Sequence, residues 1–117
     1  MKIIITTLFI LLLTSAVAHC QTQAEMNIQA STTFKKADKE LNKTYTALFN
    51  KLDAAEKKAL AAAEKAWITF RDLECKFECM ENEGGSIYPL VYSSCLTNMT
   101  EKRTAELKEV LKEMEGK

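Results

Sequence analysis

Histidine is almost absent from this chain. A single His, His19, stands among 117 residues, which removes most zinc sites and most catalytic designs that depend on histidine. Turn residues are scarce as well, since 3 Gly and 1 Pro are too few for a many-stranded all-β domain. No charge dominates either, because 16 Lys+Arg balance 16 Asp+Glu. Without a long basic tract, a general nucleic-acid binder is not expected.

What remains indicates one folded domain behind a leader. The composition, 47% hydrophobic and 27% charged, excludes a disordered chain. A positive start at Met1-Lys2, an apolar run over 3–13 and the small residues Ala16-Val17-Ala18 predict a secretory signal peptide over 1–18. The apolar run is too short for an ordinary membrane-spanning helix, although an anchoring helix is the alternative. The mature domain would span 19–117.

All four cysteines follow the predicted cleavage site, at Cys20, Cys75, Cys79 and Cys95. An even number in a small exported domain predicts two disulfides in the periplasm or outside the cell. Lipoprotein anchoring through Cys20 is the alternative. His19 argues against it, because Gly, Ala or Ser usually precedes a lipidated cysteine.

Three apolar stripes with helical spacing cover the mature chain and predict an all-α fold. Thr22 and Asp53 are expected to cap the first two helices, and Ser86 the third, with Pro89 in its first turn. The stripes are Met26, Ala30, Phe34, Ala37, Leu41, Tyr45, Leu48 and Leu52; Leu60, Ala63, Trp67, Phe70 and Phe77; and Tyr92, Leu96, Met99, Leu107, Val110 and Met114. We expect an antiparallel three-helix bundle stapled by disulfides, with helices of up to about 30 residues. A break in the third helix near Thr97 stays open.

The position of each cysteine along the bundle axis, which we call its level, favours one pairing. Around a turn at Gly84-Gly85, Cys75 lies level with about residue 94, which favours Cys75–Cys95. Cys20 lies nearer Cys79, so the second predicted disulfide is Cys20–Cys79. The alternative is a metal site built on Cys75 and Cys79.

Charged residues lie where the core should be. The same levels bring Asp38, Arg71 and Arg103 together, with Asn42 and Glu74 at the border, and arginine suits a buried carboxylate. We expect this cluster to fix the helix register rather than to catalyse a reaction, and removal of Asp38 to cost several kcal/mol. The alternative is a set of ordinary solvated charges.

The second turn is acidic. Glu78, Glu81 and Glu83 lie close together, and no basic residue stands between Lys76 and Lys102. We name Glu78, Glu81, Glu83, Ser86 and Tyr88 the acidic turn, a candidate surface for a basic protein. The alternative is a solvated helix end.

Several ordered segments carry a family signature: Met26-Asn27, 37–42, 66–75, 84–89 and 100–103. From about Met26 to Leu107 the chain resembles the LprI-like lysozyme-inhibitor domain. The resemblance implies an exported bacterial helical domain that inhibits lysozyme. Members often carry Cys at the position of Ile28-Gln29, and Cys20 can supply that partner here. Members also often have Gln in place of Glu64, a change expected to affect only a surface contact.

These observations predict an exported protein-binding domain that docks non-covalently on a lysozyme-type hydrolase. The alternative is a structural or stress-related envelope domain that binds another protein or the cell-wall layer. An enzyme is not expected, because no feature sets two carboxylates around a cleft. No cofactor, metal or nucleic acid is expected, and the oligomeric state stays open.

Overall fold

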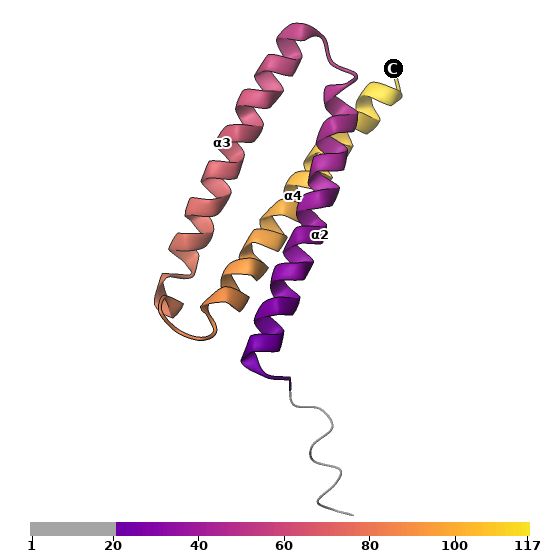
Figure 1. The fold of residues 1–117 in the computed structure, drawn as a ribbon. Coiled ribbons are helices and arrows are strands. Elements are labelled where there is room, and N and C mark those ends of the chain that lie inside the picture. The colour runs from indigo at the N-terminus through magenta and orange to yellow at the C-terminus, as the bar shows by residue number, and fades with distance from the viewer. Residues whose placement is uncertain (1–20) are drawn as a thin grey trace, which may run out of the picture.

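Three long helices form the part of the molecule that the structure describes. The computed structural model describes residues 21–117 and contains α2 (Gln23–Phe49), α3 (Ala54–Glu78), the short 3₁₀ helix η1 (Met80–Asn82) and α4 (Tyr88–Glu115). Helix α3 runs antiparallel to α2 and α4, which point the same way (Figure 1). The predicted all-α three-helix bundle is therefore confirmed.

Local sequence signals explain where the first two helices begin. The Thr22 side chain accepts a hydrogen bond from the backbone N–H of Glu25 at 3.1 Å. Asp53 and Glu56 form a reciprocal capping box, with bonds of 2.8 and 3.0 Å. Both predicted caps are present, and each satisfies donors that the first helical turn leaves free.

The start of α4 differs from the prediction. Ile87 occupies the N-cap position without a side-chain bond, so the expected cap by Ser86 is wrong. The Ser86 carbonyl instead accepts a hydrogen bond from Asn27 Nδ2 at 2.9 Å. Pro89 does lie in the first turn, where its missing N–H costs little. Helix α4 continues through Thr97 without a break.

Helices α2 and α4 form the more extensive pair. Their shared core contains Leu41, Leu48 and Leu107, all buried. Nearby, α4 buries Thr97, Thr100 and Thr104, whose short side chains occupy little space. The hydroxyl groups of Thr97 and Thr104 donate hydrogen bonds to the backbone carbonyls four residues earlier, at 3.0 and 2.9 Å. The hydroxyl groups of these two threonines are thereby satisfied.

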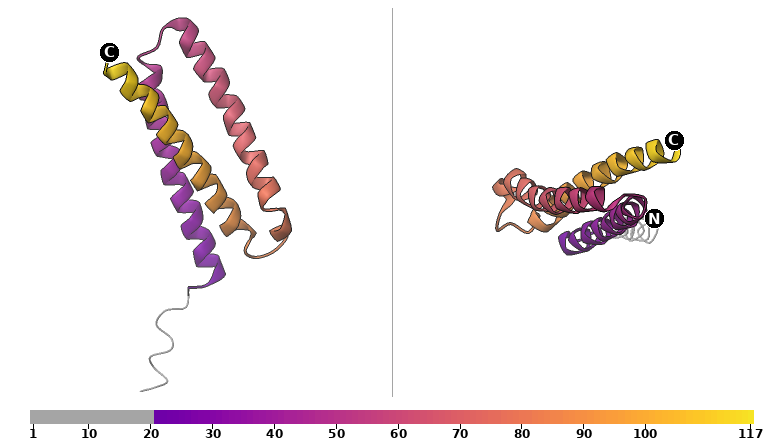
Figure 2. Two further views of the ribbon diagram at one scale, coloured as in Figure 1. Left: turned by 180° about the vertical axis from the view of Figure 1, so that it is seen from behind. Right: turned by 90° about the horizontal axis from the view of Figure 1, so that it is seen from above.

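Helix α3 packs less extensively on the other two and stands at one side of them (Figure 2). Three members of its predicted core stripe are exposed: Ala63, Phe70 at 55% and Phe77 at 68%. The prediction is wrong here because α3 has two apolar faces. Trp67 and Cys75 lie on the inner face, whereas Phe70 and Phe77 continue an outer one. Val110, at 44% exposed, also lies outside the core.

Among the helices described within 21–117, none is both long enough and apolar enough to span a membrane. The predicted signal peptide lies outside the described residues.

Core and surface positions should respond differently to truncation. Leu41 is 1% exposed, so Leu41→Ala should lower the free energy of unfolding by about 2–5 kcal/mol. In the single chain, Phe77→Ala should change it by less than about 0.5 kcal/mol, because the side chain is mostly in water already. Urea denaturation of the oxidised protein at high dilution, where the chains are separate, measures both. If truncation of Phe77 lowered the free energy of unfolding as much as truncation of Leu41, the outward orientation of this face of α3 would be contradicted.

Candidate functional site

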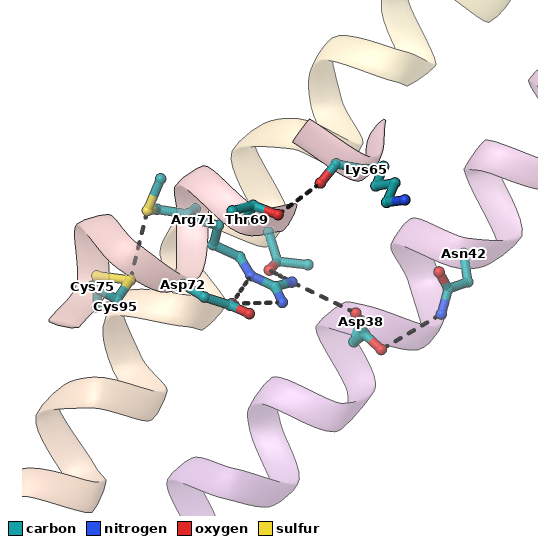
Figure 3. Close-up of polar contacts among 10 residues, drawn as sticks. Asp38, Asn42, Lys65, Thr69, Arg71, Asp72, Cys75 and Cys95 are labelled. Atoms are coloured by element: carbon teal, nitrogen blue, oxygen red, sulfur yellow. Dashed lines mark hydrogen bonds and ion pairs between the residues drawn. A yellow bond between two sulfur atoms is a disulfide. The ribbon is translucent and has the colours of Figure 1, made fainter. Parts of the chain in front are cut away.

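Arg71 connects all three helices. Its Nε and Nη2 both lie 2.9 Å from Asp72 Oδ1, and its Nη1 donates to Thr100 Oγ1 on α4 at 3.2 Å. The same Nη1 lies 3.7 Å from Asp38 Oδ1 on α2 (Figure 3). The Arg71 side chain is only 8% exposed, so these partners compensate a charge that water scarcely reaches.

Aromatic rings complete the surroundings of Arg71. Its guanidinium carbon lies 5.2 Å from the ring centre of Phe34 and 5.3 Å from that of Trp67. These are cation–π distances, and such contacts strengthen as water is removed. Arginine is therefore suited to this position by its planar, weakly hydrated head group as well as by its charge.

Arg103 forms a second, separate ion pair. Its Nε donates to Glu64 Oε2 at 3.0 Å, and its Nη1 lies 3.4 Å from Glu106 Oε2. It also lies 5.8 Å from the Trp67 ring centre. Glu64 is buried, and its other oxygen has no hydrogen-bond partner among the described residues. The expectation that Glu64 makes only a surface contact is wrong.

The structure divides the expected polar cluster in two. Arg71 faces Asp38, Arg103 faces Glu64, and Trp67 is the neighbour that both arginines share. Asp38 is 43% exposed and Arg71 keeps Asp72 as a partner. Removing Asp38 should thus cost at most about 1 kcal/mol rather than several.

The two border residues differ in their contacts. Asn42 donates to Asp38 Oδ2 at 3.5 Å (Figure 3). Glu74 joins neither ion pair in the described part of the chain. With Trp67 and Met99 it lines a cleft of about 420 Å³ between α3 and α4.

A disulfide fixes the lower end of α3. Cys75 and Cys95 are bonded, with 5.7 Å between their Cα atoms, as the helix levels predicted (Figure 3). With a sequence separation of 20 residues, this cross-link contributes on the order of 3 kcal/mol. Because the Cys75 sulfur is used in this bond, it is not available as a thiolate ligand, and the alternative metal site on Cys75 and Cys79 is ruled out.

Cys79 lies at the end of α3 as a buried thiol. Burial, and then the neighbouring Glu78 carboxylate, raise the pKa of this thiol. A raised pKa makes it a poor nucleophile near neutral pH. Its predicted partner, Cys20, lies outside the described residues, so Cys20–Cys79 stays a prediction. Within 21–117, no group of three or more His, Cys, Asp or Glu is placed to hold a metal ion.

The turn between α3 and α4 is closed by its own backbone. The backbone N–H of Asn82 donates to the carbonyl of Cys79, and the N–H of Gly85 donates to the carbonyl of Asn82, at 3.0 Å each. Gly84 adopts φ +78°, a conformation that other residues rarely reach. The bond from Asn27 to Ser86 then ties this turn to the first turns of α2.

The predicted acidic turn is mainly solvent-facing. Glu78, Glu81, Glu83 and Ser86 are exposed. Tyr88 is half-buried and stacks on Tyr92, with 5.6 Å between ring centres. The turn therefore presents carboxylates on a braced backbone.

Charge is strongly separated along the bundle. We name residues 21–34 and 72–100 the acidic end and residues 35–71 and 101–117 the basic end. The acidic end carries six carboxylates and one lysine, a net charge of −5, whereas the basic end carries 14 basic and 10 acidic side chains, a net charge of +4. The carboxylates of the acidic end are Glu25, Asp72, Glu74, Glu78, Glu81 and Glu83. A nearly neutral total thus conceals a strong field at the turn.

Exposed apolar residues lie within the acidic end and at its border, and sequence reasoning missed that they face solvent. Leu73 is 59% and Met80 60% exposed, beside Phe70 and Phe77. The available signal was the spacing of 4, 3, 4 and 3 residues from Ala66 to Met80. It marks a continuous helix face distinct from the one that contains Trp67.

Comparison with known proteins decides the family. The family model described as lysozyme inhibitor LprI matches residues 15–107. The chain belongs to the LprI lysozyme inhibitor family. An uncharacterized protein of Rhizobium meliloti is 38% identical over 107 residues, which cover 80% of this chain and 77% of that protein. A crystal structure of a DUF1311 family protein from Pseudomonas putida shares the fold, with TM-score 0.70 and 24% identity over 74% of this chain and 91% of that one.

The structure assigns physical contacts to the segments that resemble the LprI-like signature. Met26-Asn27 and the Gly84-Gly85-Ser86 segment meet through the bond from Asn27 to Ser86. Within 66–75, Trp67 and Arg71 lie within cation–π distance and Cys75 forms the disulfide. These LprI motif residues therefore build the frame, whereas the exposed carboxylates of the turn lie around it.

The Arg103–Glu64 pair can be tested by removing one partner or both. Arg103→Ala should destabilise the protein by about 3–5 kcal/mol, because it leaves the Glu64 carboxylate buried and uncompensated. The double variant Glu64→Leu/Arg103→Met should lose much less, since no charge is then stranded. Chemical denaturation of the three proteins measures the difference. Equal losses in the single and double variants would contradict this role.

Tyr92 predicts a dependence on alkaline pH. Burial, followed by the Asp72 and Tyr88 charges, raises the Tyr92 pKa. The neutral phenol is thus favoured in the folded state. Its contribution to stability is complete below the unfolded pKa of about 10 and is lost as the pH rises through the folded value. Thermal unfolding between about pH 9 and 12 should therefore show a smaller loss for Tyr92→Phe than for the parent. Identical pH profiles would contradict the shift.

Proposed function

We propose that this protein is an exported inhibitor that binds a lysozyme-type hydrolase through the acidic turn. The observation that carries the proposal is the net charge of −5 at the acidic end. Lysozymes are commonly strongly basic, so opposite charge would accelerate their association. Membership of the LprI family supports a protein partner of this kind.

The geometry of the turn supports the same proposal. Gly84 and Gly85 leave its tip thin enough to approach a catalytic cleft. Hydrogen bonds within the turn, the disulfide at its base and the bond from Asn27 order it before binding. Because little conformational entropy remains to be lost, more of the contact energy is available as affinity. Inhibition would follow from occlusion of the cleft, with no bond made or broken.

Export is part of the proposal. The leader pattern over 1–18 would send the chain to the periplasm or the exterior, where lysozymes act. The Cys75–Cys95 disulfide is consistent with an oxidising compartment. In the exported protein we expect Cys20 to pair with Cys79, which would add a second cross-link beside the acidic turn.

Charge reversal at the turn tests the binding surface. Glu81→Lys/Glu83→Lys should weaken lysozyme binding by about tenfold or more, and should flatten the salt dependence of the association rate. Surface plasmon resonance against hen-type, goose-type and invertebrate-type lysozymes measures both effects. The oxidised protein is used, after its intact mass has shown that it begins at His19.

A matched control lies at the basic end. Glu109→Lys/Glu113→Lys changes the total charge equally, and both glutamates are exposed on α4. This control should keep the parent affinity. Equal weakening by the two double variants would leave net charge, and not the turn, as the determinant. No binding of any lysozyme class by the parent would refute the proposed function.

A further inference from the structure

The outer face of α3 is an apolar surface that the bundle leaves uncovered. We define this outer face by seven residues spaced alternately by 4 and 3 along α3 and into η1: Ala59, Ala63, Ala66, Phe70, Leu73, Phe77 and Met80. All seven are exposed, the four large ones by 55–68%. A strict alternation of 3 and 4 is the seam of a two-helix coiled coil.

The residue sizes along the face are unevenly distributed. The first three positions are alanine, and the next four carry large side chains. Two copies of α3 that run antiparallel, with their two-fold axis level with Ile68, would place three of the four large residues opposite an alanine, whereas Met80 would lie level with Glu56 at the end of the seam. The pairs are Phe70 with Ala66, Leu73 with Ala63, and Phe77 with Ala59 of the second copy. Such interdigitation of large and small side chains is how a seam fills without voids.

We propose that the outer face of α3 is the interface of an antiparallel two-fold homodimer. The face complements itself in size, and a two-fold interface requires one surface to match itself. Helix α3 stands at one side of α2 and α4 in Figure 1 and in the left view of Figure 2, and the large residues of its outer face are exposed to a second copy.

The area is sufficient for a dimer. A whole side chain of this size covers about 150–250 Å², so the four large residues expose on the order of 450 Å² per copy. Two copies would bury up to about 900 Å² from these residues, a value that includes Met80 at the end of the seam. The alanines and the stems of the flanking lysines add to this, and the total reaches the range of about 1,000–1,200 Å² at which specific interfaces begin.

Charge decides between the two possible directions. In a parallel dimer the acidic ends, each with net charge −5, would lie side by side. In the antiparallel dimer each acidic end lies beside the partner's basic end. The antiparallel arrangement does bring Lys58 near Lys76 of the second copy. Two-fold symmetry repeats this exposed pair, and the two together change an association constant by about 25-fold at most, whereas leaving a large apolar layer unfilled changes it by roughly a hundredfold or more.

The dimer and the proposed function are independent. The tip of the acidic turn lies beyond the outer face of α3, so an antiparallel dimer would present one free turn at each end. Loss of either property would leave the other testable.

Sedimentation equilibrium of the oxidised mature protein tests the dimer. At about 100 μM, above the micromolar Kd found at the weak end of standard-size interfaces, the protein should have the mass of two chains. Leu73→Asp should weaken dimerisation by at least tenfold, or about 1.4 kcal/mol. Because Leu73 is exposed in the single chain, the variant should melt, by circular dichroism, at the same temperature as the parent protein diluted to single chains. The control Ile28→Asp alters an equally exposed residue on α2, 69% exposed, and should remain dimeric.

Cysteine cross-linking tests the direction. Ala63→Cys and Leu73→Cys chains should form a disulfide when mixed, but neither should cross-link with itself, because equal positions then lie about 15 Å apart along the axis. Self-cross-linking of Ala63→Cys would show a parallel dimer and overturn the proposed arrangement. A single-chain mass for the parent, or a dimer that Leu73→Asp does not weaken, would overturn the interface. If Leu73 became shielded from solvent only when lysozyme is bound, the outer face of α3 would be assigned to lysozyme instead of to a second copy.

Discussion

The packing of α3 depends on the buried charge of Arg71. Helices α2 and α4 share an apolar core, but α3 contributes little to it. The Arg71 side chain, which is 8% exposed and is held by Asp72, Thr100 and Asp38, fixes α3 against both neighbours. The Arg103–Glu64 pair and the Cys75–Cys95 disulfide fix the same helix above and below. Because directional contacts set its position, α3 does not need to turn all its apolar residues inward.

Two surfaces follow from this arrangement. The disulfide and the Asn27–Ser86 bond hold the turn in place, so its carboxylates project from a fixed backbone. The polar attachment of α3 leaves its outer face free for contact with a second chain. The first surface is suited by charge to a basic partner, and the second is suited by size pattern to itself. A small domain can thereby carry two binding surfaces on one helix and the turn that follows it.

Much of the fold could be predicted from periodicity and caps. The three stripes, the caps at Thr22 and Asp53, and the level of Cys75 with Cys95 follow from helix geometry alone. The choice of face on α3 could not, because Trp67 and Phe70 are three residues apart and both fit an apolar stripe. What decides it is the ion pairs: Arg71 and Glu64 must face partners on other helices, and this rotates Phe70 outward.

The site was predictable only in part. The acidic turn was visible as a run without basic residues, but its connection to α2 through Asn27 was not, since it depends on a tertiary contact. Likewise, a sequence cannot show which carboxylate each arginine selects. Glu64 lies 39 residues from Arg103 in the sequence. Because relatives often carry Gln at this position, the sequence was equally compatible with a surface contact.

The central claim is that the braced acidic turn is where a basic hydrolase docks. Amide chemical-shift mapping of the oxidised, isotope-labelled protein during titration with lysozyme tests it most directly. The account predicts that the largest changes cluster over residues 78–88 and the adjoining first turns of α2, and that they diminish as salt is added. Changes centred on the basic end, or none at all, would contradict it.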